Sequence, residues 1–283
     1  MASLAVKIVL VVCLAYVAIL GVLYVFQDRL IYYPQVGRNA GTTPAARGIA
    51  YDEVAIRTDD GEILSAWWIP APESRGVALH LPGNAGNISH RIDYALMFRA
   101  LGFSTLLVDY RGYGKSTGKP SEEGTYSDAD AAWRWLTEMR EIPGRDIVVY
   151  GESLGGGVSS WLASRYPPRA LVLASTFTSA VELGAELYWF LPVRMISRFR
   201  YDTLTRLAAV HAPVLVIHSR ADEIVPFAHG EQLYAAANAP KAFLEISGGH
   251  NDSAVFMRRE WVEALGAFLD RTGDGRQPQA VSR

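Results

Sequence analysis

Three residues of this 283-residue chain have the types and the order that serine-based acyl transfer requires. Ser153 lies in the pattern G-E-S-L-G, Asp222 follows in H-S-R-A-D-E, and His250 follows in S-G-G-H-N-D. A serine hydroxyl becomes a strong nucleophile when an imidazole accepts its proton and a carboxylate orients that imidazole. The order Ser, Asp, His is typical of a serine held in a nucleophile elbow. We therefore predict Ser153 as the nucleophile, His250 as the general base and Asp222 as its orienting acid.

The residues around Ser153 predict a sharp turn between a strand and a helix. A β-branched run ends at Tyr150, and residues 158–166 are compatible with a helix. Gly151 and Gly155 allow the strand and the helix to approach more closely than side chains would permit. The helix N-terminus adds partial positive charge where an oxyanion would form. The same pattern also occurs in non-catalytic turns, so the prediction depends on the acid and the base elsewhere in the chain.

An acyl-transfer site also needs two backbone N–H donors for the oxyanion. The residue after the nucleophile, Leu154, is predicted to supply one. The loop after the third predicted strand reads L-P-G-N-A-G-N over Leu81–Asn87 and places Asn84 as the second donor. Its glycines permit the close backbone approach that this role requires.

Other acids and histidines compete for these roles. Glu223 and Asp252 lie next to the predicted acid and base, and they are the alternative acids. His80 falls within a predicted strand, His90 opens a helix, and His218 ends the strand before the acid. These positions favour structural roles for the three histidines.

The elements that would position these residues alternate between strands and helices. A hairpin over 51–69 turns at an Asp-Gly pair, and it is followed by short apolar strands separated by helical segments. The later strands are predicted at Val77–Leu81, Ser104–Val108, Ile147–Tyr150, Ala170–Leu173, Val214–Ser219 and Ala242–Ile246, and one of the intervening helices is predicted at Tyr126–Arg140. This order predicts an α/β fold with a mostly parallel, doubly wound sheet. The predicted acid and base then both follow strands at the carboxyl edge, where Ser153 lies.

Between residues 176 and 210 the alternation lapses into a segment rich in large apolar residues. In an α/β fold such an insertion covers the carboxyl edge of the sheet, where ligands bind. We predict a small helical cap there, with Phe177, Leu187 and Trp189 contacting an acyl chain. The alternative is a pair of helices packed on the core.

The N-terminal part of the chain predicts a membrane anchor. Ile8–Phe26 is an uncharged run of 19 residues, close to the length of about 20 that crosses a bilayer core. It is longer than a usual signal-peptide core, and Gln27–Tyr32 offers no small-residue cleavage site. We therefore predict an anchor over 1–29 with its transmembrane part at 8–26, a hydrolase-like domain over 30–272 and a flexible tail over 273–283, with the protein located at a membrane.

Composition excludes several classes of partner. The formal net charge is −2 with no block of like charges, which is not the footprint of a nucleic-acid binder. The single cysteine, Cys13, excludes an internal disulfide. No Cys/His cluster has metal-ligand spacing, so we predict neither a metal nor a cofactor.

Taken together, the motifs resemble the serine α/β-hydrolase family, and specifically its membrane-anchored branch of lysophospholipases, monoacylglycerol-type lipases and protein depalmitoylases. The resemblance covers about residues 30 to 270, and its motifs are Leu81–Asn87, Asp109–Ser116, Gly151–Gly156, the Asp222 loop and Gly248–Asp252. The family loop usually reads His-Gly-Asn, whereas here Pro82 takes the place of the histidine. Because proline has no N–H, the loop that carries Asn84 must be braced in another way.

The resemblance implies a membrane-tethered serine hydrolase that cleaves acyl esters or thioesters of lipid-like substrates through an acyl-enzyme. The expected partners are the lipid bilayer and the acyl substrate. An acyltransferase or a peptidase is an alternative on the same residues, since fold does not fix function. A non-catalytic membrane-bound binding or scaffold protein is the alternative from another class.

Overall fold

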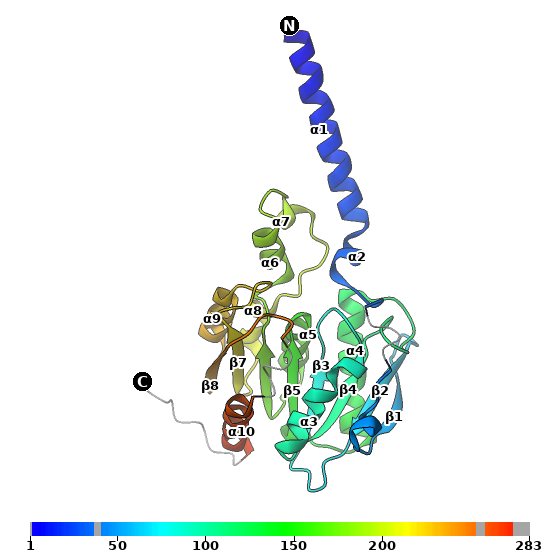
Figure 1. Cartoon of the computed structure of the whole chain (residues 1–283), viewed down its shortest axis with the longest axis vertical. Helices are drawn as coiled ribbons and strands as arrows, with labels where there is room; N and C mark the ends of the chain where they lie inside the picture. Colours follow the sequence, from blue (N-terminus) through cyan, green and yellow to red (C-terminus); the bar gives the residue numbers. More distant parts are fainter. Residues whose placement is uncertain (1, 37–40, 253–257, 274–283) are drawn as a thin grey trace.

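The computed structural model describes residues 2–36, 41–252 and 258–273, and its centre is an eight-stranded sheet (Figure 1). The strand order is β1-β2-β4-β3-β5-β6-β7-β8. The pairs β1–β2 and β2–β4 are antiparallel, and the remaining neighbours are parallel. The strands are β1 (Asp52–Arg57), β2 (Ile63–Ile69), β3 (Val77–Leu81), β4 (Ser104–Val108), β5 (Ile147–Glu152), β6 (Ala170–Ala174), β7 (Val214–Ser219) and β8 (Lys241–Ile246). The predicted hairpin and the mostly parallel α/β sheet are confirmed.

Helices pack on both faces of this sheet. The helices α3 and α10 form one hydrophobic core with β3, β5, β6 and β7, and α4, α5 and α9 pack against the other face (Figure 1). Their bounds are α3 (Ile92–Ala100), α4 (Glu122–Arg134), α5 (Leu154–Arg165), α9 (Phe227–Ala236) and α10 (Arg259–Gly273). Single turns of 3₁₀-helix occupy Pro44–Arg47, Ile88–Arg91, Gly144–Asp146 and Leu207–Ala209. The central strands are buried on both sides, which explains their continuous apolar runs.

One predicted helix differs in its bounds. We predicted a helix from 126 to 140, but α4 begins at Glu122 because the Ser121 side chain accepts the N–H of Gly124 and caps its first turn. The last predicted turn, Trp135–Met139, is π-helical. The N-cap hydrogen bond of Ser121, rather than the apolar periodicity, decides where this helix starts.

The N-terminal helix α1 (Ala2–Val25) extends away from the domain (Figure 1). Among the described residues it is the one helix that is long and apolar enough to cross a membrane, and its apolar window is entirely unburied. A short helix, α2 (Gln27–Ile31), then leads into the domain. The predicted tail lies outside the described residues beyond Gly273.

A small helical cap lies between β6 and β7, on the same side of the sheet as α1 and α2 (Figure 1). Its helices are α6 (Ala180–Leu187) and α7 (Val193–Ile196), followed by α8 (Thr203–Arg206). The Ser179 side chain accepts the N–H of Glu182 and caps α6. The cap therefore covers the carboxyl edge of the sheet, as predicted for an insertion in this position.

Candidate active site

Ser153 lies in the tight turn between β5 and α5. Its φ is 52° and its ψ is −117°, a strained conformation for a residue with a side chain. The backbone holds this turn, because the Ser153 N–H donates to the Ala174 carbonyl over 2.9 Å. A Cβ at Gly155 would lie 2.0 Å from the Leu81 carbonyl oxygen, so only glycine allows α5 to pack this closely against the end of β3.

The structure brings the three predicted residues into hydrogen-bonding contact. Ser153 Oγ is 3.0 Å from His250 Nε2. On the other side of the ring, His250 Nδ1 lies 2.8 Å and 3.0 Å from the two carboxylate oxygens of Asp222. The carboxylate accepts a hydrogen bond from Nδ1–H, and this tautomer leaves Nε2 free to accept a proton from the serine hydroxyl.

The surroundings of Asp222 keep its carboxylate ionised. Burial by itself would raise the pKa of Asp222, but the hydrogen bond and charge of His250 and the N–H groups of Ile224 and Val225 lower it below its ordinary value. The alternative acid Glu223 instead accepts the backbone N–H of His250 over 2.9 Å. Glu223 thus holds the histidine backbone, while Asp222 faces the imidazole.

The two backbone groups predicted to bind an oxyanion lie on either side of Ser153. Leu154 N begins α5, and Asn84 lies in the loop after β3. Neither N–H donates to a protein acceptor anywhere in the described ranges, so both are available to a ligand. A Cβ built on Gly83 would be 3.5 Å from the Ser153 Cβ, which puts this loop directly against the nucleophile.

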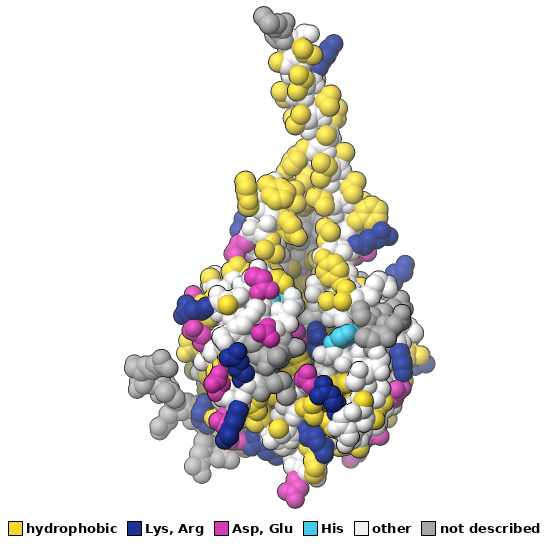
Figure 2. Space-filling model, viewed as in Figure 1, with side chains coloured by type: hydrophobic (Ala, Val, Ile, Leu, Met, Phe, Trp, Pro, Cys, Tyr) yellow, Lys and Arg dark blue, Asp and Glu magenta, His cyan; other side chains and the backbone are white. Residues whose placement is uncertain are grey.

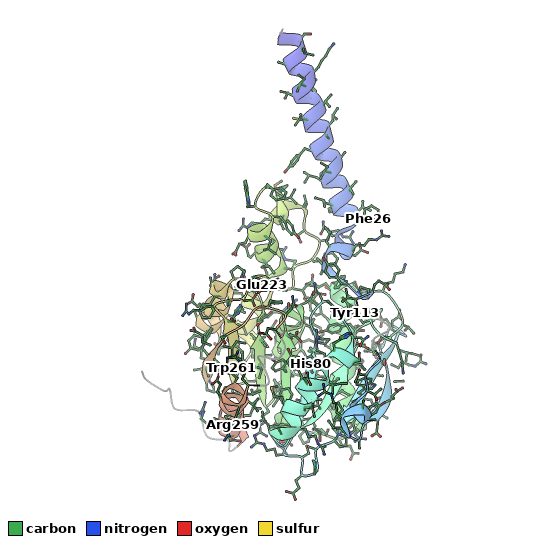
Figure 3. The ribbon with its side chains drawn as sticks, in the orientation of Figure 1. Phe26, His80, Tyr113, Glu223, Arg259 and Trp261 are labelled. Carbon is green, nitrogen blue, oxygen red and sulfur yellow. The ribbon has the colours of Figure 1, made fainter. Side chains whose placement is uncertain are left out.

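The segment that follows α1 braces this loop. The Asn84 side chain donates to the Ile31 carbonyl over 2.7 Å, and the Asn84 carbonyl accepts the Tyr33 N–H over 2.9 Å. The Tyr113 hydroxyl donates to the same Asn84 carbonyl over 2.8 Å. Figure 3 shows Tyr113 in the domain below Phe26, which marks the junction of α1 and α2. These bonds restrain both sides of the Asn84 residue, although Pro82 replaces the family histidine.

We call residues 27–33 the strap, because they also bind the cap. The Gln27 side chain donates to the Ile196 carbonyl over 2.7 Å and accepts the Arg198 N–H over 2.8 Å. The buried Tyr32 hydroxyl is 2.6 Å from that of Tyr201. The strap therefore connects the cap to the loop that carries Asn84. Our sequence analysis missed this role, since nothing in the local pattern relates the strap to partners so distant in the chain.

A largely buried ionic cluster adjoins the turn. Glu152 Oε2 is 3.0 Å from Arg91 Nε and 3.7 Å from His80 Nε2. Burial by itself would raise the pKa of Glu152, but Arg91 and His80 hold it at about 2. Burial lowers the pKa of His80 below its ordinary value. Figure 3 shows His80 within the sheet, where its role is structural, as its position in a strand predicted.

A cleft of about 680 Å³ lies over Ser153 and His250. Apolar side chains from the strap, the cap and the loop after β7 line much of it; they include Leu30, Ile31, Phe177, Leu183, Leu187, Tyr188, Ile224 and Val225. The loop and turn after β3 form another wall, where the lining is more polar and includes Asn84, His90 and Arg91. Of the three predicted substrate contacts, Phe177 and Leu187 line the cleft. Trp189 does not: it lies beyond the end of α6 with 83% of its surface exposed. An apolar side chain in an insertion need not face the cleft, and this one lies at the outer end of the cap.

Comparisons with known proteins agree with this architecture. A family model described as alpha/beta hydrolase fold matches residues 79–212. An uncharacterised protein of Mycobacterium tuberculosis is 41% identical over 273 residues, which cover 95% of this chain and 96% of the relative. The alpha/beta hydrolase domain-containing protein WAV2 of Arabidopsis thaliana is 35% identical over 292 residues, covering 94% of this chain and 95% of WAV2.

Among solved structures, the esterase Pf2001 of Pyrococcus furiosus is similar over 82% of this chain and 96% of its own, with a TM-score of 0.69 and 25% identity. The chain therefore belongs to the α/β-hydrolase family, and its fold is that of an esterase-like member. Its N-terminal apolar helix is a candidate membrane span.

Proposed function

We propose that the protein is a membrane-tethered serine hydrolase that cleaves acyl esters or thioesters of lipid-like molecules. The observation that carries this proposal is the chain of contacts from Ser153 Oγ through His250 to Asp222, beside a cleft with many apolar side chains in its walls. The esterase similarity of the fold supports the same reaction class.

In the first half-reaction His250 Nε2 takes the Ser153 hydroxyl proton while Oγ forms a bond to the acyl carbon. The carbonyl electrons move onto oxygen, and the N–H groups of Leu154 and Asn84 stabilise that oxyanion. The bond to the leaving alcohol or thiol then breaks, and the leaving group receives the proton from His250. A water molecule repeats the sequence on the acyl-enzyme, releasing a carboxylic acid and the free serine.

The walls of the cleft favour an acyl chain as the part of the substrate that is bound. Burial of each methylene against such side chains contributes about 0.8 kcal/mol. Attachment through α1 would keep the domain at a surface where acyl chains are concentrated. Both features support a lipid-like ester or thioester in preference to a peptide.

Fluorophosphonate labelling of the detergent-solubilised full-length protein tests the proposal, with the modified residue located by peptide mass spectrometry. We expect labelling at Ser153, its loss in Ser153→Ala, and its retention in Ser164→Ala, which alters another serine on α5. The His250→Ala variant should abolish labelling without unfolding the protein. A folded wild-type protein that does not react would overturn the hydrolase proposal and favour a binding protein.

A further inference from the structure

The outer end of the cap presents a cluster of large apolar side chains to the surroundings. Trp189 is 83% exposed, Met195 86% and Phe190 58%, and Leu187 and Tyr188 are about half exposed. We call these five residues the cap tip. A soluble surface rarely carries a contiguous apolar patch without a partner that covers it.

The cap tip lies beside the helix that is the candidate membrane span. The Tyr16 hydroxyl on α1 donates to the Phe190 carbonyl over 3.1 Å. Tyr16 is about 14 Å from the Val25 end of α1, at about 1.5 Å per residue. One leaflet of a bilayer core is about 15 Å thick, half of the full thickness. If α1 spans the bilayer from Val25, the cap tip therefore reaches well into the adjacent leaflet.

Backbone hydrogen bonds in and next to the cap tip lower the cost of placing it in an apolar environment. The N–H groups of Tyr188, Leu191 and Val193 donate to carbonyls within the cap. The contact between Tyr16 and Phe190 satisfies a hydroxyl in the middle of α1 and a loop carbonyl at once. Unpaired polar groups cost several kcal/mol in lipid, so this pairing is stabilising where no water is present.

Arginine side chains mark the level below the cap tip. Arg198 is exposed; its guanidinium donates to the Tyr24 carbonyl and lies 5.7 Å from the centroid of the Tyr24 ring. Arg29, next to α1 on the strap, is also exposed. Figure 2 shows hydrophobic side chains over α1 and the adjoining part of the cap, with most charged side chains on the globular part beneath. Arginines and aromatic rings at one level are typical of a lipid headgroup region.

We propose that the cap tip inserts into the same lipid leaflet that α1 enters, so that the protein is held at two points and the cleft opens toward the leaflet. This inference rests on the proposed membrane tether. Leu30 on the strap and Leu187 on the cap both line the cleft and are exposed, so the proposed route of an acyl chain from lipid to Ser153 runs past these two side chains. The continuity with α1 identifies the occupant as lipid rather than a protein partner.

A single environment-sensitive fluorophore, NBD, on cysteine tests the insertion in the full-length protein. Cys13 is the only cysteine, so its own thiol reports on α1. In a Cys13→Ser background, Trp189→Cys reports on the cap tip. Met139→Cys is the matched control, since Met139 is 74% exposed but lies in the segment before the amino end of β5. Each labelled protein is reconstituted in phosphatidylcholine–phosphatidylglycerol vesicles.

We expect emission from position 189 to shift to shorter wavelength and to be quenched by nitroxides on lipid acyl chains, as at position 13, and not by iodide. Emission from position 139 should not shift, and it should be quenched by iodide and not by the lipid nitroxides. Quenching of position 189 by iodide while position 13 is quenched by lipid would overturn the inference and leave the proposed function intact. Iodide quenching at both positions would overturn the tether and the insertion together, whereas fluorophosphonate labelling of Ser153 tests the chemistry independently.

A second expectation concerns activity. Trp189→Ser and Met195→Ser should reduce hydrolysis of long-chain esters embedded in vesicles and leave hydrolysis of a short water-soluble ester unchanged. If the variants hydrolyse the embedded esters as fast as the wild-type protein does, the proposed route through the leaflet is contradicted. A loss on both substrates would indicate damage to the fold and would likewise contradict the specific role.

Discussion

Replacing Asn84 by alanine should lower kcat, although this change leaves the backbone N–H of the residue in place. The Asn84 side chain is one of the two direct hydrogen-bonded links between the strap and the loop beside Ser153, and it donates to the Ile31 carbonyl over 2.7 Å. Without it Asn84, whose N–H is the proposed oxyanion donor, is held through its own carbonyl only, which accepts hydrogen bonds from Tyr33 and Tyr113.

The magnitude follows from the bond that is lost. Leaving a partly buried carbonyl such as that of Ile31 without its donor costs about 1–3 kcal/mol. If the loop conformation that presents the Asn84 N–H is destabilised by this amount, kcat decreases by a factor of about 5 to 150. Complete loss of one oxyanion donor sets the upper limit, at about 100- to 1,000-fold. Because the oxyanion forms only in the transition state, KM should change little.

The assay is steady-state hydrolysis of a short-chain p-nitrophenyl ester by the solubilised full-length protein, with the melting temperature measured in parallel. The matched control is Asn238→Ala. That change removes an asparagine side chain whose amide donates to three backbone carbonyls, including Val210, at a distance from the cleft. The control should lose stability and keep its kcat.

Three results would refute the reasoning. An Asn84→Ala variant with wild-type kcat would show that the strap does not position the loop. A rise in KM with constant kcat would place the effect on substrate binding alone. If Asn238→Ala loses stability and kcat to the same extent as Asn84→Ala, the Asn84 hydrogen bond acts only on folding.

Three further predictions follow from the same geometry. Asp222→Asn should lower kcat about 10⁴-fold in a folded protein, because the amide favours the wrong imidazole tautomer; circular dichroism checks the fold. Gly155→Ala should destabilise the protein by about 3 kcal/mol or more in denaturant unfolding, since its Cβ would meet the Leu81 carbonyl oxygen at 2.0 Å. Burial by itself would raise the pKa of Glu152, but Arg91 holds it at about 2, below the ordinary 4.5. The free energy of unfolding should therefore fall as the pH falls from about 4.5 to about 2, because the unfolded chain takes up the Glu152 proton first. In acid titrations, Glu152→Gln should make the free energy of unfolding depend less on pH over this range.

The sequence by itself determined the architecture and the edge of the sheet at which the candidate site lies. Strand and helix periods are local, and the positions of Ser153, Asp222 and His250 after separate strands put them at one edge of any parallel sheet. The loop of Asn84 and the long apolar run of α1 could be read in the same way, from neighbouring residues alone. These predictions needed no knowledge of which distant segments meet.

Only the tertiary structure decided the contacts between segments that are far apart in the chain. It selected Asp222 over Glu223 as the carboxylate facing the imidazole, and it placed Trp189 outside the cleft. It also joined the strap to the cap and to the loop of Asn84, although Gln27 and Ile196 are 169 residues apart. Hydrophobic periodicity shows that a side chain is apolar or lies on a given face, but not which surface that face will meet. Partners of this kind are fixed by packing of the whole chain, and for that reason the brace on the loop of Asn84 became visible only in the folded protein.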